Sequence, residues 1–318
     1  MTNQFPLVTV AHLCYNTGPL VIEAIKSVLA NDYPNIQHLI LDDCSTDDSY
    51  DQLLSFTQSV ESNIKLLKNN TNQGINKSQN RLLTLASGKY YLLVGDDVML
   101  PDKIKTDVDF LEKSPATTYA VISHGQIFTD NPAELSESLH GVNDQFHSSP
   151  ALPPLALLES LFMRNWICAP TAMFVTNHLR TFKHPEDFFI EDYPYWVTNA
   201  IHGYTLGYRP QTSILYRRHS AALTMQHHHS LVALKISKDR IRCLLLIANH
   251  TDRKSDNPRI VRDGINILQY GDQDLQSWYI NLVQSLKLRG VIYYSSKISL
   301  NPKWLRAAWY LSQFTQRV

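Results

Sequence analysis

Short apolar runs of β-forming residues alternate with helix-like segments along the first third of the chain. Apolar residues in the helix-like segments recur at the spacing of one helical face. Strands that alternate with helices pair in parallel through right-handed crossovers, and the helices then cover both faces of the sheet. This order predicts an α/β fold with an open, Rossmann-like, mostly parallel sheet. The strands are expected at 7–13, 36–41, 64–67 and 90–94, and the helices at 20–30, 45–60, 75–86 and 101–111.

The pattern changes near residue 225, where strand signals end and helical periodicity takes over. We therefore predict two parts, an α/β domain over 1–225 and a C-terminal helical region over 226–318. Before the boundary we expect strands at 119–128, 172–175 and 214–216, a helix at 155–162 and a loop at 129–154. After the boundary we expect helices at 231–248, 275–288 and 302–314.

Charge and cysteine content exclude several classes of protein. Lys plus Arg and Asp plus Glu number 29 each, so the chain lacks the basic excess of a nucleic-acid-binding protein. The four cysteines are far apart with no CxxC pair, which fits neither a zinc site nor a disulfide scaffold. The N-terminus does not resemble a signal peptide, and no run approaches the roughly 20 apolar residues of a membrane span. We expect a cytoplasmic protein, or one peripheral on the inner face of the cell membrane.

Polar clusters follow three of the expected strands directly. They are Tyr15-Asn16, Asp42-Asp43 and Asp96-Asp97. In open α/β sheets, ligands bind outside the carboxyl ends of the strands. The sequence therefore predicts a ligand site at this edge of the sheet.

The Gly95-Asp96-Asp97 cluster has two interpretations. Adjacent carboxylates at the end of a buried strand repel each other unless a cation offsets the charge, and Mg²⁺ or Mn²⁺ with oxygen ligands is the usual solution. Alternatively, Asp97 caps or lies near the helix expected from Pro101. Asp42-Asp43 has the same geometry, and its alternative is a strand-to-helix turn in which Ser45 or Thr46 caps the next helix.

Two later clusters also carry candidate chemistry. Glu191-Asp192 lies in an aromatic stretch at 188–196, where partial desolvation would raise proton affinity and suit a general base. The alternative is a surface acid beside a structural aromatic cluster. The segment 216–219, Tyr-Arg-Arg-His, would place positive charge near a diphosphate leaving group, or it is a solvated loop. We interpret the three histidines at 227–229 as a polar loop or helix start, because consecutive helical residues point in different directions.

Taken in order, seven motifs between residues 6 and 225 resemble those of the family-two glycosyltransferases, which have the GT-A fold. Each motif on its own is far less specific than the ordered set. The motifs lie at 6–16, ending in Tyr15-Asn16, at 27–34, at 41–47 (similar to DDxSxD), at 72–90, at 95–104 (Gly-Asp-Asp followed by Leu-Pro-Asp-Lys-Ile), at 191–193 and at 216–219.

The resemblance implies transfer of a sugar, with inversion, from a nucleoside-diphosphate sugar to an acceptor hydroxyl during bacterial surface-polysaccharide synthesis. UDP is the usual nucleotide of the family. By the same resemblance Asp97 would ligate Mn²⁺ or Mg²⁺, and Asp192, with Glu191 beside it, would deprotonate the acceptor. The donor would contact Tyr15, Asn16, Asp43, Gly74, Asp96, Arg218 and His219.

Two departures from the family pattern affect the site. Val94 stands where relatives often carry an Asp two residues before the second acid, which shortens the metal motif. Gln79 stands where many relatives carry Arg, which removes one phosphate or base contact.

The acceptor is expected to be a saccharide, free or linked to a lipid diphosphate as in related bacterial enzymes. Residues 303–317 combine aromatic and basic side chains, so the last helix would suit a lipid interface, and packing on the catalytic domain is the alternative. Two other functions remain open, a non-catalytic nucleotide-sugar or carbohydrate-binding scaffold and a nucleotidylyltransferase. The second requires a Gly-rich triphosphate loop near the N-terminus, and 13–18 does not provide one.

Overall fold

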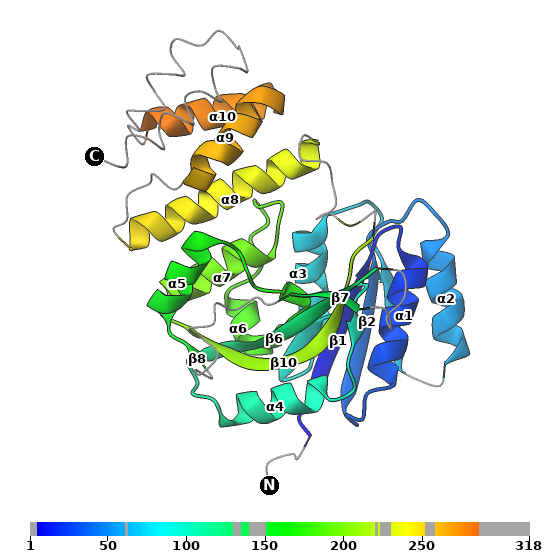
Figure 1. Cartoon of the computed structure of the whole chain (residues 1–318). Coiled ribbons are helices and arrows are strands. Elements are labelled where there is room, and N and C mark those ends of the chain that lie inside the picture. Colours follow the sequence, from blue (N-terminus) through cyan, green and yellow to red (C-terminus); the bar gives the residue numbers. More distant parts are fainter. Residues whose placement is uncertain are drawn as a thin grey trace. The chain divides into compact units, whose positions relative to one another are not determined.

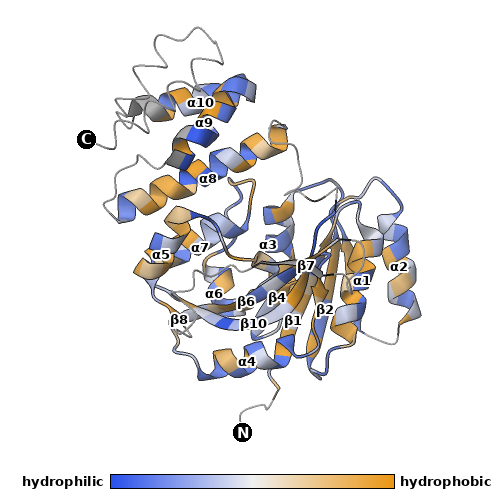
Figure 2. Cartoon of the chain, viewed as in Figure 1, coloured by the Kyte–Doolittle hydropathy of each residue, from blue (hydrophilic) through white to orange (hydrophobic). Residues whose placement is uncertain are grey.

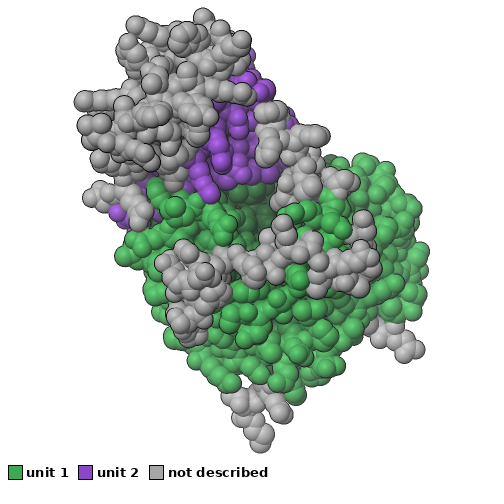
Figure 3. Space-filling view, in the orientation of Figure 1, with its two compact units in different colours: residues 1–219 green, residues 220–318 purple. Residues whose placement is uncertain are grey.

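The computed structural model describes residues 5–60, 63–129, 135–139, 151–219, 222, 230–251 and 258–285. The chain forms two compact units, Met1–His219 (unit 1) and Ser220–Val318 (unit 2), which Figure 3 colours separately. The division falls six residues before the boundary predicted from sequence.

Unit 1 combines one large sheet with seven α-helices among its described residues. The strands are β1 (Val8–Cys14), β2 (Ile36–Asp42), β3 (Ile64–Lys68), β4 (Tyr90–Leu93), β5 (Val98–Met99), β6 (Thr118–Phe128), β7 (Leu135–Leu139), β8 (Ala151–Leu152), β9 (Met173–Val175) and β10 (Thr205–Arg217). The helices are α1 (Gly18–Leu29), α2 (Ser49–Ser59), α3 (Ile75–Leu85), α4 (Lys103–Lys113), α5 (Pro154–Met163), α6 (Thr176–Thr181) and α7 (Asp192–Ile201).

The sheet runs in the order β3-β2-β1-β4-β9-β6-β10-β5, with β7 paired to β6 and β8 to β10. Strands β3, β2, β1 and β4 are parallel. Strand β9 is antiparallel to β4 and β6, while β10 is parallel to β6. The predicted α/β class with a mostly parallel sheet is confirmed.

Helices cover both faces of the parallel half. Figure 1 shows α1 and α2 on one side of β1 to β3 and α3 on the other, as right-handed crossovers require when the strand order reverses after β3. Strand β1 is almost entirely buried because it lies between two strands and two helical layers. Figure 2 shows the hydrophobic residues concentrated in β1 and β2 and along one side of the helices.

Two local predictions were wrong, and a third gave a strand that is too short. Helix α2 begins at Ser49 and has no side-chain cap, because Ser45 and Thr46 bond to Asn16 instead. The expected loop at 129–154 contains β7 and β8, which gain backbone partners on β6 and β10 that composition cannot reveal. The strand expected at 214–216 is the end of the 13-residue β10, whose exposed polar centre at 210–212 hides it in the sequence.

Unit 2 contains α8 (Leu231–His250), α9 (Pro258–Tyr270) and α10 (Gln273–Ser285). Ser230 caps α8 by accepting a hydrogen bond from the Ala233 amide at 3.2 Å. Arg240 of α8 and Asp263 of α9 form an ion pair at 2.9 Å. Helix α9 was not predicted, and the expected helix at 302–314 and the histidines at 227–229 lie outside the described residues. Among the described helices, none has the length and hydropathy to span a membrane.

A buried ionic cluster joins α4 to β10 in unit 1. Lys103 Nζ lies 2.6 Å from Asp107 Oδ2 and donates to the Thr171 carbonyl at 2.7 Å. Arg209 binds the other oxygen of the Asp107 carboxylate at 2.8 Å. Lys103 and Asp107 are almost completely buried, so each needs the other to offset the cost of leaving water.

We predict that Asp107→Asn lowers the free energy of unfolding by about 3–5 kcal/mol, because it leaves the Lys103 charge buried without its counter-ion. Urea denaturation measures the change. Asp109→Asn is a matched control on the same helix, since the Lys105–Asp109 pair is more than half exposed and should contribute only about 0–1 kcal/mol. Equal effects of the two substitutions would contradict the prediction.

Candidate active site

The polar clusters predicted from sequence follow neighbouring strands at one edge of the sheet. Strand β1 lies between β2 and β4, and all three run in the same direction. The Cα of Cys14 pairs with that of Asp42 in the register, and the Asp43 amide donates to the Cys14 carbonyl at 2.8 Å. The carboxyl ends of these strands therefore present their following residues side by side.

Asn16 joins the end of β1 to the loop that follows β2. Its backbone has a φ of 56°, and its amide N–H donates to Ser45 Oγ at 2.9 Å. Its side chain accepts from the Thr46 amide at 2.8 Å and donates to Thr46 Oγ1 at 3.2 Å. The Asn16 side chain is thus occupied in holding the backbone, whereas the neighbouring Tyr15 ring is 45% exposed and available to a ligand.

Asp43 is buried and orders the loop before α3. Its Oδ1 accepts hydrogen bonds from Asn69 Nδ2 at 2.6 Å and from the Gln73 amide at 2.9 Å. Its Oδ2 accepts from the Gly74 amide at 2.9 Å. Gly74 has a φ of 79°, in the left-handed region where a side chain would be strained. Asp43 and Gly74 therefore form one structural unit at the start of α3.

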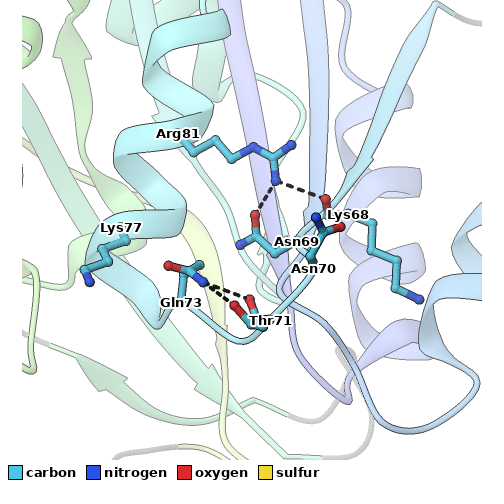
Figure 4. A pocket seen from close by; sticks show the side chains of 7 residues that line it. All are labelled: Lys68, Asn69, Asn70, Thr71, Gln73, Lys77 and Arg81. Atoms are coloured by element: carbon cyan, nitrogen blue, oxygen red, sulfur yellow. Dashed lines mark hydrogen bonds between the residues drawn. The ribbon is translucent and has the colours of Figure 1, made fainter.

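A basic pocket of about 540 Å³ lies on the outer side of this loop. Figure 4 shows Arg81 of α3 reaching the Asn69 side chain and the Lys68 carbonyl. Asn69 also binds Asp43, so the pocket shares a hydrogen-bonded residue with the Asp43 network. No acid lines the pocket, and its walls are Lys68, Asn69, Asn70, Thr71, Gln73, Lys77 and Arg81.

The Asp96-Asp97 pair follows β4 through Gly95, whose φ is 63°. Asp97 Oδ1 accepts a hydrogen bond from the Arg217 amide at 2.7 Å, and Asp96 Oδ2 lies 2.8 Å from His219 Nε2. Helix α4 begins at Lys103, so the alternative in which Asp97 caps that helix is wrong. The two acids instead face the end of β10, which explains why the 216–219 segment belongs to the same site.

The Arg217 side chain makes no ion pair with Asp97, and its charge offsets only part of the rise in the Asp97 pKa. Its guanidinium lies 2.6 Å from Glu23 and stacks over the Phe128 ring, 4.5 Å from the ring centroid. Burial, and then the neighbouring Asp96 charge, raise the pKa of Asp97 well above its usual range. Arg218 is half-buried, and its guanidinium forms no ion pair with another described residue.

The chemistry of this pair fits a divalent cation. Asp97 keeps Oδ2 without a protein hydrogen bond among the described residues, and a cation would offset the repulsion that raises its pKa. Carboxylate oxygens suit Mg²⁺ or Mn²⁺. The described residues hold no group of three His, Cys, Asp or Glu side chains that could bind a metal by themselves, so such an ion would need further oxygens from a ligand.

Glu191 and Asp192 stand at the start of α7, both half-buried. Asp192 Oδ2 accepts from Asn165 Nδ2 at 2.8 Å, and Oδ1 accepts from the Tyr193 amide at 2.6 Å. Burial raises the pKa of Asp192. Burial and then the Asp192 charge raise the pKa of Glu191 to about 8. The structure therefore places a half-buried acid pair here and not a fully exposed surface acid.

Helix α3 holds the segment that leads to this pair. Asn76 Nδ2 donates to the Phe188 carbonyl at 2.8 Å, and Asn80 Nδ2 donates to the His184 carbonyl at 2.9 Å. The two asparagines are four residues apart and so share one face of the helix. Their amides position the 184–190 segment relative to the loop that Asp43 orders.

Cys168 is a half-buried cysteine in the segment between α5 and β9. Burial is the main cause of the raised pKa of its thiol, and the charges of Asp97 and Asp192 raise it further. The segment 165–171 contacts the surroundings of both acid pairs, because Asn165 binds Asp192 and the Thr171 carbonyl accepts from Lys103 of α4. Asp43 lies at the end of β2, beyond β1.

Three contacts at the site were not predicted from sequence. They involve Asn165 with Asp192, Glu23 with Arg217, and Asn76 with the 184–190 segment. The buried polar residues of α3 were a usable signal, because Asn76 and Asn80 occupy helix positions where periodicity would place apolar side chains. Nothing in the local sequence marks Asn165 or Glu23.

A mostly parallel sheet with paired acids after β4 and a second acid pair at the start of α7 is the arrangement of a glycosyltransferase of the GT-A fold. Residues 9–154 match the sequence profile described as Glycosyl transferase family 2. The matched segment contains Asp43, Gly74 and Asp97, whereas Asp192 and the 216–219 segment lie beyond it.

Similar proteins agree with this assignment. An uncharacterized glycosyltransferase of Haemophilus influenzae is 28% identical over 245 residues, which cover 74% of this chain and 73% of that protein. The UDP-Glc:alpha-D-GlcNAc-diphosphoundecaprenol beta-1,3-glucosyltransferase WfaP of Escherichia coli is 33% identical over 107 residues, 33% of this chain and 41% of that enzyme. The mannosyltransferase PcManGT of Pyrobaculum calidifontis, solved with GDP-Man and Mn²⁺, has a TM-score of 0.55 at 16% identity and shares the fold over 98% of this chain and 88% of its own.

We predict that Glu191→Gln changes how stability depends on pH. The Glu191 pKa is about 8 in the folded chain against an ordinary 4.5, so the folded state binds this proton more tightly than the unfolded state. The resulting stabilisation is complete below about pH 4.5 and is lost as pH rises to about 8. The glutamine variant cannot lose this proton. The difference in free energy of unfolding, variant minus wild type, should therefore rise by at least about 1.4 kcal/mol between pH 5 and pH 8, the equivalent of one pKa unit.

Urea denaturation at pH 5, 6, 7 and 8 without added metal measures this difference. Other titrating groups, including the buried His12 and His184 with pKa values lowered to about 4, affect both proteins equally. A difference that stays constant across this range would show that Glu191 titrates normally.

Proposed function

We propose that the chain transfers a hexose, with inversion, from a UDP-sugar to the hydroxyl of a saccharide acceptor, with a divalent cation and Asp192 as general base. The observation that supports this proposal best is the geometry of the two acids: Asp97 binds the Arg217 amide through Oδ1 alone, and Asp192 is held by Asn165 and the Tyr193 amide. Among the described residues Asp97 keeps Oδ2 without a hydrogen bond, and burial raises the pKa of Asp192. Leaving-group stabilisation and proton abstraction need this pair of properties.

The nucleoside end of the donor is proposed to bind at Tyr15 and Asp43. The exposed Tyr15 ring offers a face on which a base can stack. Asp43 binds the Cys14 carbonyl through its amide and the Gly74 amide through its side chain, and so connects the end of β1 to the loop before α3. UDP is proposed because the relative WfaP uses UDP-Glc by its name. The fold neighbour PcManGT was solved with GDP-Man. A thermal-shift screen of UDP-, GDP- and dTDP-sugars with Mn²⁺ and Mg²⁺ tests which nucleotide this chain binds. A bound donor stabilises the fold by mass action.

The diphosphate end is proposed to lie at Asp96, Asp97, Arg218 and His219. Asp97 would hold Mn²⁺ or Mg²⁺, which when bound supplies positive charge to the departing nucleoside diphosphate. Arg218 and His219 stand beside the two acids on the end of β10 and add fixed donors for the phosphate oxygens. The shortened motif, with Val94 buried in place of a third acid, leaves Asp97 as the proposed protein ligand.

Asp192 is proposed to accept the proton of the acceptor hydroxyl. The oxygen of that hydroxyl forms the new bond to the anomeric carbon as the bond from that carbon to the diphosphate breaks, and the proton moves to the Asp192 carboxylate. Attack opposite the leaving group inverts the anomeric configuration. The raised pKa of Asp192 improves proton transfer because a base with a pKa nearer the working pH is a better catalyst.

The acceptor is proposed to be a saccharide carried on a lipid diphosphate, as the name of WfaP describes for that enzyme. This proposal places the chain in the cytoplasm or on the inner membrane face, with the C-terminal helices as a peripheral contact. A flotation assay that compares the full chain with a chain ending near residue 300 tests the contribution of the last segment. Equal membrane association of the two would exclude a role for it.

We predict that Asp192→Asn lowers kcat by at least about 100-fold while leaving donor binding unchanged, because general-base catalysis contributes roughly 10²–10⁴. Release of nucleoside diphosphate in the presence of acceptor measures transfer, and thermal shift with the donor measures binding. Asp187→Asn, at an exposed aspartate in the preceding segment, is the control and should be active. Full transfer by Asp192→Asn would show that the base is misassigned.

We predict that Asp97→Asn removes the metal-dependent part of donor binding. Wild-type protein should show a larger thermal shift with UDP-sugar plus Mn²⁺ than with UDP-sugar in chelator, and the variant should show no such difference. Asp102→Asn serves as the control, because this exposed residue precedes α4 and makes no side-chain cap. Unchanged activity of the wild type in chelator would exclude a role for the metal in transfer. Nucleotide-sugar binding without transfer or hydrolysis would favour the non-catalytic scaffold.

A further inference from the structure

The segment between α5 and β9 supplies a side chain that contacts the proposed base. Asn165 lies two residues after the end of α5, and its Nδ2 is 2.8 Å from Asp192 Oδ2. An ionised carboxylate only accepts hydrogen bonds, so the amide nitrogen of Asn165 must face Asp192. The Asn165 Oδ1 atom is buried and has no hydrogen-bond partner among the described residues. The orientation of this amide is therefore set by its bond to Asp192.

Backbone and side-chain contacts fix Asn165 independently of Asp192. The Arg164 amide donates to the Ser160 carbonyl at 3.3 Å, and Trp166 Nε1 donates to Ser160 Oγ at 2.9 Å. Further along, the Thr171 amide donates to the Cys168 carbonyl at 3.0 Å. Asn165 thus projects from a segment that is anchored on both sides, and the loss of its side chain should not unfold the segment.

The surroundings of Asp192 provide few other means of stabilising its charge. Its Oδ1 accepts from the Tyr193 amide, and Asn165 is the side chain that donates to its Oδ2. The titratable groups nearby are Glu191, which is itself acidic, and the Cys168 thiol. His184 contacts the Glu191 carbonyl with a ring whose pKa burial lowers to about 4, so it carries no charge at neutral pH. No described cation forms an ion pair with Asp192.

We infer that Asn165 is a positioning residue for sugar transfer, which holds the Asp192 carboxylate in one orientation and in its ionised form. This inference rests on the proposed role of Asp192 as general base. A hydrogen bond donated to the charged form of an acid favours that form. Without the Asn165 amide, Oδ2 would lose its protein donor while Asp192 stayed half-buried beside Glu191. A larger fraction of the base would then be protonated at neutral pH and unable to accept a proton.

The test is the pH profile of kcat for Asn165→Leu, which keeps a similar side-chain volume and removes the donor. We expect the acidic limb, which reports the Glu191–Asp192 pair, to move up by about one pKa unit. The variant should then be roughly tenfold slower than wild type near pH 6 and should approach the wild-type rate above pH 9. The donor KM should not change, because Asn165 does not contact the Asp43 or Asp97 regions.

Trp166→Phe is the matched control in the same segment. It removes the indole bond to Ser160 and perturbs packing without touching Asp192, so its acidic limb should stay at the wild-type position. A merely structural role for Asn165 would lower kcat by the same factor at every pH, and that result would overturn the inference. An unchanged profile would overturn it equally.

Failure of the inference can be distinguished from failure of the proposed function. If Asp192→Asn is inactive and Asn165→Leu leaves the acidic limb in place, Asp192 is the base and Asn165 does not position it. If Asp192→Asn retains transfer, the general base lies elsewhere and the inference fails with the proposed function.

Discussion

Hydrogen bonds from backbone amides to partly or fully buried carboxylates hold this site together. Asp43 accepts from the amides of Gln73 and Gly74, Asp97 from that of Arg217, and Asp192 from that of Tyr193. A carboxylate withdrawn from water is costly unless donors replace the lost hydration. Backbone amides provide donors without adding charge. For Asp97 and Asp192 these donors do not offset burial, which still raises the pKa of both acids.

The same bonds assemble the site from distant parts of the chain. Asp97 reaches across 120 residues to the end of β10, and this contact brings Arg218 and His219 beside the metal motif. Arg217 itself is turned toward Glu23 and the Phe128 ring, so its amide binds the acid while its side chain anchors the strand. The last residues of the sheet are thereby fixed against the first half of the fold, although they lie beyond the segment that matches the family profile.

The strand ends could be predicted from sequence because Asn16, Asp43 and Asp97 follow apolar runs directly, and parallel pairing brings such residues to one edge. The roles of Ser45 and Thr46 could not, since a capping residue and a residue that bonds to Asn16 have the same local pattern. Asn165 could not be predicted either, because its contact with Asp192 spans 27 residues and lies in a segment without periodicity. Long-range polar contacts of this kind depend on the tertiary packing alone.

Helix α3 contacts both the proposed nucleoside site and the segment that leads to the proposed base. Its first turn follows Gly74, which binds Asp43, and its Asn76 and Asn80 hold the chain that leads to Asp192. A helix is stiff along its axis and rises a constant 1.5 Å per residue. It therefore keeps a constant distance between the Asp43–Gly74 contact and the segment that leads to Asp192. Changes in the loops beyond these contacts would therefore leave the spacing between Gly74 and the 184–190 segment unaltered.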